Sequence, residues 1–291
     1  MLVFDEVDIN IHTDGKFSET ENSLKHKTIL TIAVYFIVSF FRGGKMDLFE
    51  TASGTYFAFQ PIVEPTMGVT FGFELLLRHD SDSFSIPDFF DSAFEKGVLH
   101  RLDLLLREKA FETIIKVPFY KEMTFFYNID NRILLDKEYE QGKTEEFLKK
   151  TELLTENICF EISERHEIKK KNYQNIFSSY KNRSFLVAID DYGAGYSGLK
   201  TLYNFEPDFI KIDRFLITDI FHDPKKRLFV SSLVDMVHKM GIQVIAEGVE
   251  TELELLGCEE CDCDFVQGYF IQRPTPDISE LRKKYDVSLE N

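Results

Sequence analysis

The sequence predicts an α/β protein built as a modified (β/α)8 barrel of the TIM type. From about residue 55 onward, short runs rich in β-branched and aromatic residues alternate with helical stretches, and no long linker interrupts them. Eight such runs can be counted in a chain of 291 residues. This number of strands and this length favour a closed barrel over an open sheet.

The eight candidate strands are bounded by turn residues and by helical stretches. The first two are joined only through Pro65 and Gly68, which leaves no room for the crossover helix that a parallel pair requires. The first strand is therefore expected to run antiparallel and to make the start of the barrel irregular. The predicted strands are 56–62, 69–77, 123–129, 157–162, 185–190, 208–212, 242–246 and 264–266.

Two helices are clearest. Residues 98–116 carry apolar side chains at steps of three and four, the spacing of an amphipathic helix. Pro224 suits the first position of a helix over 225–239, because proline lacks the N–H that a helix start leaves unpaired. Gly241 follows as the expected C-terminal stop of that helix.

The N-terminal 45 residues differ from the rest, and two interpretations of them remain open. The run 28–41 is uncharged and mostly apolar, but fourteen helical residues span only about 21 Å of a hydrocarbon layer about 30 Å thick. It is either a short membrane anchor with cytoplasmic Arg42 and Lys45, or part of translated upstream sequence with Met46 as the native start. Polar residues before the run argue against a signal peptide. We expect a cytoplasmic domain over 46–291, with 1–45 as an extension.

Charge and cysteine content narrow the functions further. The net charge of −16 argues against binding a DNA or RNA polymer, but it permits a phosphate ligand held through metal ions. Cys258, Cys261 and Cys263 are either a metal knuckle or packing thiols. They lack a second pair of ligands, which favours packing, and with Cys159 they indicate a reducing compartment.

Nearly every predicted strand ends in a polar side chain, and in a barrel these ends share one rim. So many carboxylates on one rim would repel each other unless cations were bound. Oxygen ligands suit Mg²⁺ or Mn²⁺, and the absence of His argues against zinc. The residues at the strand ends are Glu74, Asn128, Glu161, Asp190, Asp191, Lys211, Asp213, Glu247 and Gln267.

These residues lie in motifs that resemble those of the EAL-domain cyclic di-GMP phosphodiesterases, a bacterial hydrolase family. The resemblance runs from about Tyr56 to Pro274, with Leu75 in place of the usual Ala and Gly198 where a second Ser is common; neither change removes a ligand. No cyclase G-G-D-E-F motif is present. The matching segments are Glu74–Arg78, Asn128, Glu161–Glu164, Asp190–Ser197, Lys211–Asp213, Glu247–Thr251 and Gln267–Tyr269.

The resemblance implies a role for each matching residue. Lys211 would orient and polarise the attacking water, and Glu247 would share in accepting its proton. Gln60, Arg78 and Gln267 would contact substrate. Glu164, Asp213 and Glu250 would support the loops around the site. Two divalent cations, Mg²⁺ or Mn²⁺, would be held by Glu74, Asn128, Glu161, Asp190, Asp191 and Glu247, with Glu74 also counted as catalytic.

The resemblance also implies the reaction, hydrolysis of cyclic di-GMP to linear pGpG, which lowers the level of this second messenger. A homodimer is expected on the same ground. The alternative is a catalytically silent EAL module that acts as a cyclic di-GMP receptor or a protein-interaction regulator. Such modules usually lose a metal ligand or the lysine, and this sequence keeps them all. Another type of barrel metallohydrolase is disfavoured by the order of the motifs.

Overall fold

The computed structural model describes residues 48–81, 84–135, 142–163, 178–193 and 199–287. The apolar run 28–41, Met46 and Glu164, all singled out in the sequence, lie outside these residues. Within the described part, no helix is both long enough and apolar enough to cross a membrane.

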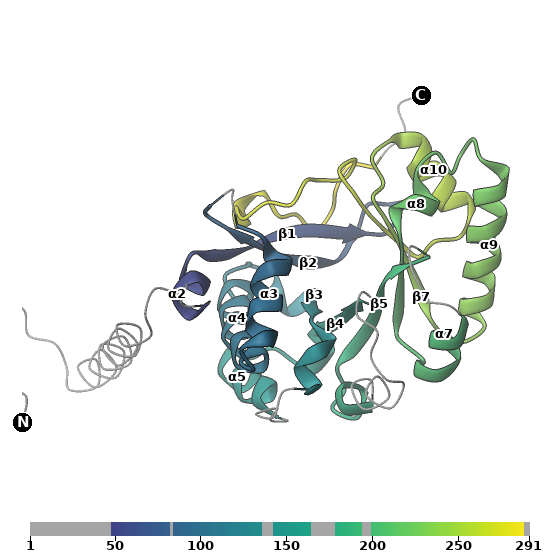
Figure 1. The fold of residues 1–291 in the computed structure, drawn as a ribbon. Coiled ribbons are helices and arrows are strands. Elements are labelled where there is room, and N and C mark those ends of the chain that lie inside the picture. The colour runs from purple at the N-terminus through teal and green to yellow at the C-terminus, as the bar shows by residue number, and fades with distance from the viewer. Residues whose placement is uncertain (1–47, 82–83, 136–141, 164–177, 194–198, 288–291) are drawn as a thin grey trace, which may run out of the picture. The chain divides into compact units, whose positions relative to one another are not determined.

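Eight strands close into a barrel in chain order (Figure 1). The first strand is antiparallel to both of its neighbours, and the remaining neighbours pair in parallel. The predicted modified barrel with an antiparallel first strand is therefore confirmed. The strands are β1 Thr55–Val63, β2 Thr70–His79, β3 Thr124–Ile129, β4 Ile158–Ser163, β5 Leu186–Tyr192, β6 Phe209–Ile212, β7 Gln243–Glu247 and β8 Phe265–Gln267.

Helices cover the outside of the barrel, with α3, α4 and α5 on one side and α9 and α10 on the other (Figure 1). The long helix α9 begins at Pro224 as predicted, because Asp223 caps it by accepting the N–H groups of Lys225 and Lys226. Gly241 follows it with a φ of 77°, which suits glycine. The helices are α2 Leu48–Ser53, α3 Ile86–Glu95, α4 Leu99–Ile114, α5 Lys143–Thr151, α7 Leu199–Phe205, α8 Arg214–Ile217, α9 Pro224–His238 and α10 Glu252–Glu260, with single 3₁₀ turns at Tyr120–Glu122, Asn131–Leu135, Thr155–Asn157 and Ile278–Glu280.

The hydrophobic core has two parts. A large outer core lies between the strands and the helices, and it includes Cys258, Cys261 and Cys263 as buried free thiols. This agrees with the packing interpretation of these cysteines. A small inner core plugs the barrel, and against it Phe71 stacks on Phe265 with ring centroids 4.2 Å apart. The buried members of the inner core are Ile62, Phe126, Cys159, Ala188, Phe209 and Ile245.

Strand β2 contributes a glycine at the level of this plug. A Cβ on Gly72 would lie 2.1 Å from the backbone oxygen of Thr124 and 3.3 Å from the ring of Phe126. Only glycine therefore lets β2 come this close to β3 while Phe126 fills the barrel.

Candidate active site

The site lies directly above the inner core because side chains alternate along a strand. A residue two positions beyond a plug residue points into the barrel again, closer to the C-terminal rim. On β1, which runs the other way, Gln60 precedes Ile62 by two positions. On each of the other strands, a residue at the level of the plug is followed two positions later by a site residue: Gly72 by Glu74, Phe126 by Asn128, Cys159 by Glu161, Ala188 by Asp190, Phe209 by Lys211, Ile245 by Glu247 and Phe265 by Gln267.

Lys211 stands at the centre of the site. Its side chain is 1% exposed. Burial lowers the pKa of this amine, but the four surrounding carboxylates outweigh burial and hold the pKa well above its usual value. The side chain is therefore an ammonium ion at neutral pH. Its Nζ atom lies 2.6 Å from Glu161 Oε1, 2.7 Å from Glu247 Oε1, 3.2 Å from Glu74 Oε2 and 3.2 Å from Asp190 Oδ1.

Glu74 is held in place by side-chain amides from β3 and β8. Asn128 Nδ2 donates to Glu74 Oε1 at 2.8 Å, and Gln267 Nε2 donates to Glu74 Oε2 at 2.6 Å. Burial raises the pKa of this carboxyl, but Lys211 and these hydrogen bonds lower it more, so the net shift is downward. Glu74 is thus an ionised and fixed member of the cluster.

The negative charges of the other three carboxylates around Lys211 are less well compensated. Burial, followed by repulsion from Glu74, raises the pKa of Glu161 well above its usual range. Burial raises the pKa of Glu247 to about 8, and it also raises the pKa of Asp190. A single ammonium group therefore does not balance the negative charge collected here.

An irregularity in β5 adds a further carboxylate. Ile189 pairs with Ile210 and Tyr192 pairs with Ile212, so Asp190 and Asp191 together stand opposite the single residue Lys211. This is the geometry of a β-bulge, and Asp191 has a left-handed backbone with a φ of 55°. Carboxylate oxygens of Asp190, Asp191 and Glu247 lie within 4.8 Å of one another.

The donor atoms fit hard divalent cations. Glu161 Oε2 is buried without a hydrogen-bond partner among the described residues, and Gln267 Oε1 is in the same state. Asn128 donates a hydrogen bond through its nitrogen, which leaves its Oδ1 atom available as a ligand for a cation. Carboxylate and amide oxygens in surplus negative charge are what Mg²⁺ and Mn²⁺ bind in proteins. The residues present therefore fit the predicted metals.

Gln60 and Arg78, both expected to contact substrate, differ in their hydrogen-bond partners. Gln60 accepts a hydrogen bond from Gln267 Nε2 at 3.1 Å and donates to the backbone oxygen of Gln272 at 3.3 Å. Arg78 donates to the neighbouring oxygen of Leu77 and forms no ion pair within the described part of the chain. The guanidinium of Arg78 is therefore not neutralised by a described rim carboxylate.

Asp213 and Glu250, two of the three residues expected to support the loops, lie in the described part of the chain. Asp213 caps α8 by accepting the N–H of Phe215 at 2.8 Å. Glu250 forms a two-point ion pair with Arg214, in which Nη2 lies 2.6 Å from Oε2. Sequence reasoning did not single out Arg214, and no local signal marks it.

Glu254 was also missed from the sequence. It accepts the N–H groups of Glu250 at 2.8 Å, Thr251 at 3.1 Å and Asp219 at 3.1 Å, so it ties together the loops that follow β6 and β7. The spacing Thr251-x-x-Glu254 is the capping-box signature, which could have identified it.

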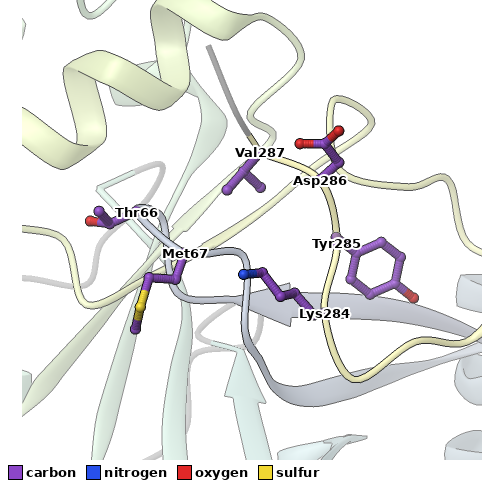
Figure 2. Close-up of a pocket in the computed structure, with 6 residues that line it drawn as sticks. All are labelled: Thr66, Met67, Lys284, Tyr285, Asp286 and Val287. Carbon is purple, nitrogen blue, oxygen red and sulfur yellow. The ribbon is translucent and has the colours of Figure 1, made fainter.

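A cavity of about 600 Å³ lies elsewhere, at the opposite end of the barrel (Figure 2). Thr66 and Met67, from the turn between β1 and β2, line it together with the segment Lys284–Val287. Since β2 begins at Thr70, this is the N-terminal end of the parallel strands, and no predicted site residue lines the cavity.

Comparison with known proteins finds a matching domain family and several relatives. The EAL domain family model matches residues 48–274. An uncharacterized signaling protein of Caulobacter vibrioides is 31% identical over 225 residues, which are 75% of this chain and 27% of that protein. The Probable cyclic di-GMP phosphodiesterase PdeN of Escherichia coli is 28% identical over 230 residues, 76% of this chain and 43% of PdeN. The chain thus spans less than half the length of these two relatives.

A solved structure shows the same fold. The Klebsiella pneumoniae BlrP1 complex with calcium and cyclic di-GMP superposes with a TM-score of 0.69 at 30% sequence identity. The superposition covers 76% of this chain and 56% of that one.

Proposed function

Because the chain belongs to the EAL-domain family, we propose that it is a metal-dependent phosphodiesterase that hydrolyses cyclic di-GMP to linear pGpG. The observation that carries this proposal is the buried cluster of Lys211 with four carboxylates at the C-terminal mouth of the barrel. A catalytically silent module has no need for this cluster, which keeps several negative charges out of water.

The ligands proposed for two divalent cations are Glu74, Asn128, Glu161, Asp190, Asp191 and Glu247. The bulge at Asp190–Asp191 supports this assignment, since it lets one strand contribute two adjacent carboxylates. When bound, two such cations neutralise a phosphodiester, lower the pKa of a water and stabilise the leaving oxygen.

Lys211 and Glu247 have complementary tasks in this proposal. The raised pKa of Lys211 keeps it charged, so it donates hydrogen bonds to the attacking water and does not act as a base. Glu247 lies 2.7 Å from Lys211 and is placed to take the proton of that water. The water oxygen bonds to phosphorus, the bond from phosphorus to a ribose 3′-oxygen breaks, and that oxygen takes a proton from solvent to become the free 3′-hydroxyl of linear pGpG.

The rim holds the substrate in this account. Arg78, which has no ion pair among the described residues, is available to bind a phosphate oxygen. Gln267 donates to both Gln60 and Glu74, so Gln60 and Gln267 are placed to align the substrate relative to the proposed metal ligand Glu74. We also propose that the protein is a homodimer, which rests on the family resemblance alone.

The direct test is product analysis. The purified protein is incubated with cyclic di-GMP in Mn²⁺, in Mg²⁺ or in chelator, and the nucleotides are separated. The proposal expects pGpG with at least one metal and none in chelator. Binding of cyclic di-GMP without pGpG under either metal would favour the receptor alternative.

A further inference from the structure

An ion pair links the two loops that follow β6 and β7. Arg214 begins α8, three residues after Lys211, and Glu250 lies three residues after Glu247. Both guanidinium Nη atoms contact Glu250, with Nη2 lying 2.6 Å from Oε2. The pair thus joins the segments that carry two central members of the site.

The stem of Arg214 also lies against the backbone beside Glu247. A Cβ on Gly248 would lie 2.6 Å from Cγ, 2.7 Å from Cβ and 2.9 Å from Cδ of Arg214. Gly248 has a φ of 71°, so glycine is needed there for its backbone as well as for this close approach. Arg214 therefore contacts the β7 loop at two points, Gly248 and Glu250.

Two ion pairs therefore join β6 and the loop after it to β7 and the loop after it. Lys211 contacts Glu247 at 2.7 Å inside the barrel, and Arg214 contacts Glu250 outside it. The C-terminal part of the β7 loop is fixed independently of Arg214, because Glu254 accepts the N–H groups of Glu250 and Thr251. Arg214 then sets how closely this loop approaches β6.

We propose that Arg214 is a positioning residue for the metal site, which holds Glu247 toward Lys211 and the Asp190–Asp191 bulge by binding Glu250. This inference rests on the proposed function, since it assigns Glu247 as a metal ligand. The side chain of Arg214 is 50% exposed, so the pair adds little to global stability. Loss of the ion pair should therefore weaken metal binding measurably while it leaves the melting temperature almost unchanged.

The test is calorimetric titration of the full chain with Mn²⁺ alone, without nucleotide. Arg214→Met keeps an apolar stem and removes the guanidinium, and we expect about tenfold weaker Mn²⁺ binding with a nearly unchanged melting temperature. The double charge swap R214E/E250R should recover most of the loss. The matched control is Arg183→Met, because Arg183 contacts both carboxylate oxygens of Glu145 at 3.1 Å just before β5, at the other end of the barrel. Its Mn²⁺ affinity should equal that of the wild type.

Glu161→Gln, titrated in the same series, distinguishes a failure of the proposed metal site from a failure of the positioning role of Arg214. If Glu161→Gln loses Mn²⁺ binding while Arg214→Met binds like the wild type, the positioning role is overturned and the metal site stands. If Glu161→Gln keeps wild-type affinity, the proposed metal site itself fails. If the double variant R214E/E250R binds Mn²⁺ as weakly as Arg214→Met does, the ion pair is not the cause of the lost affinity.

Discussion

Asp190 and Asp191 are adjacent in the chain, yet both carboxylates face the same cluster. In a regular strand one of them would point away from the barrel axis. The bulge places both opposite Lys211, and the left-handed backbone of Asp191 redirects its side chain. One strand end thereby supplies two neighbouring carboxylates, which suits the proposed site for two cations.

Glu161→Gln should stabilise the metal-free protein while it abolishes the response to metal. Glu161 is fully buried, and burial with repulsion from Glu74 disfavours its charge, so a neutral amide relieves that cost. We expect the melting temperature in chelator to rise by about 2–4 °C for each kcal/mol relieved. Added Mn²⁺ should then produce no further rise, in contrast to the wild type. A fall in the chelator melting temperature would contradict this.

Lys211→Met should abolish turnover and destabilise the metal-free protein. The substitution leaves the carboxylates that contact Nζ without their common counter-ion, and breaking a buried ion pair typically costs about 3–5 kcal/mol. Mn²⁺ should recover stability but not turnover. Denaturant unfolding and pGpG formation are the measurements.

The matched control for Lys211→Met is Lys239→Met. It removes an exposed pair with Asp235 on α9 and should change neither quantity. Wild-type turnover in Lys211→Met would refute the role of this lysine.

The metal-free protein should lose stability as pH rises from 5 to 8. Burial raises the pKa of Glu247 from 4.5 to about 8, and it raises those of Glu161 and Asp190 as well. In this window the folded state binds more protons than the unfolded state, so the free energy of unfolding falls with pH. The lowered pKa of Glu74 acts only below its usual range.

Melting temperatures in chelator at several pH values measure this slope. Saturating Mn²⁺ should remove the decline, because cations stabilise the ionised carboxylates. Glu247→Gln should make the chelator slope shallower. A melting temperature that rises from pH 5 to pH 8 in chelator would show that these carboxylates are not held in a protonated state.

We propose that the functional domain comprises residues 46–291 and that Met46 is the native start. The intact mass of the protein produced from its native gene is then expected to match a chain that begins at Met46. A mass that includes residues 1–45 would contradict this, and it would favour the membrane-anchor interpretation of 28–41.

The barrel could be predicted from the sequence because each strand is a short run rich in β-branched and aromatic residues, bounded by turn residues or helical stretches. All eight predicted strands are present, and their ends brought Glu74, Glu161, Lys211 and Glu247 together as expected. The short helix α3 was not singled out, although Ser85 and Pro87 mark its start. Its ten residues carry too short a pattern to stand out.

The contacts that complete the site could not be read from local pattern. The bulge at Asp190–Asp191 depends on pairing with β6, and periodicity within β5 gives no sign of it. The ion pair between Arg214 and Glu250 joins residues 36 positions apart. Both depend on how neighbouring strands are staggered around the closed barrel, which is a property of the assembled sheet.

The most direct test of the central claim is the anomalous diffraction of crystals grown with Mn²⁺ and cyclic di-GMP. The account predicts two manganese peaks about 3.5–4 Å apart, the usual separation in two-metal sites. They should be bound by the oxygens of Glu74, Asn128, Glu161, Asp190, Asp191 and Glu247, with the Lys211 ammonium displaced from some of its present carboxylate partners. Cyclic di-GMP bound at the rim with no manganese in the cluster would contradict the account.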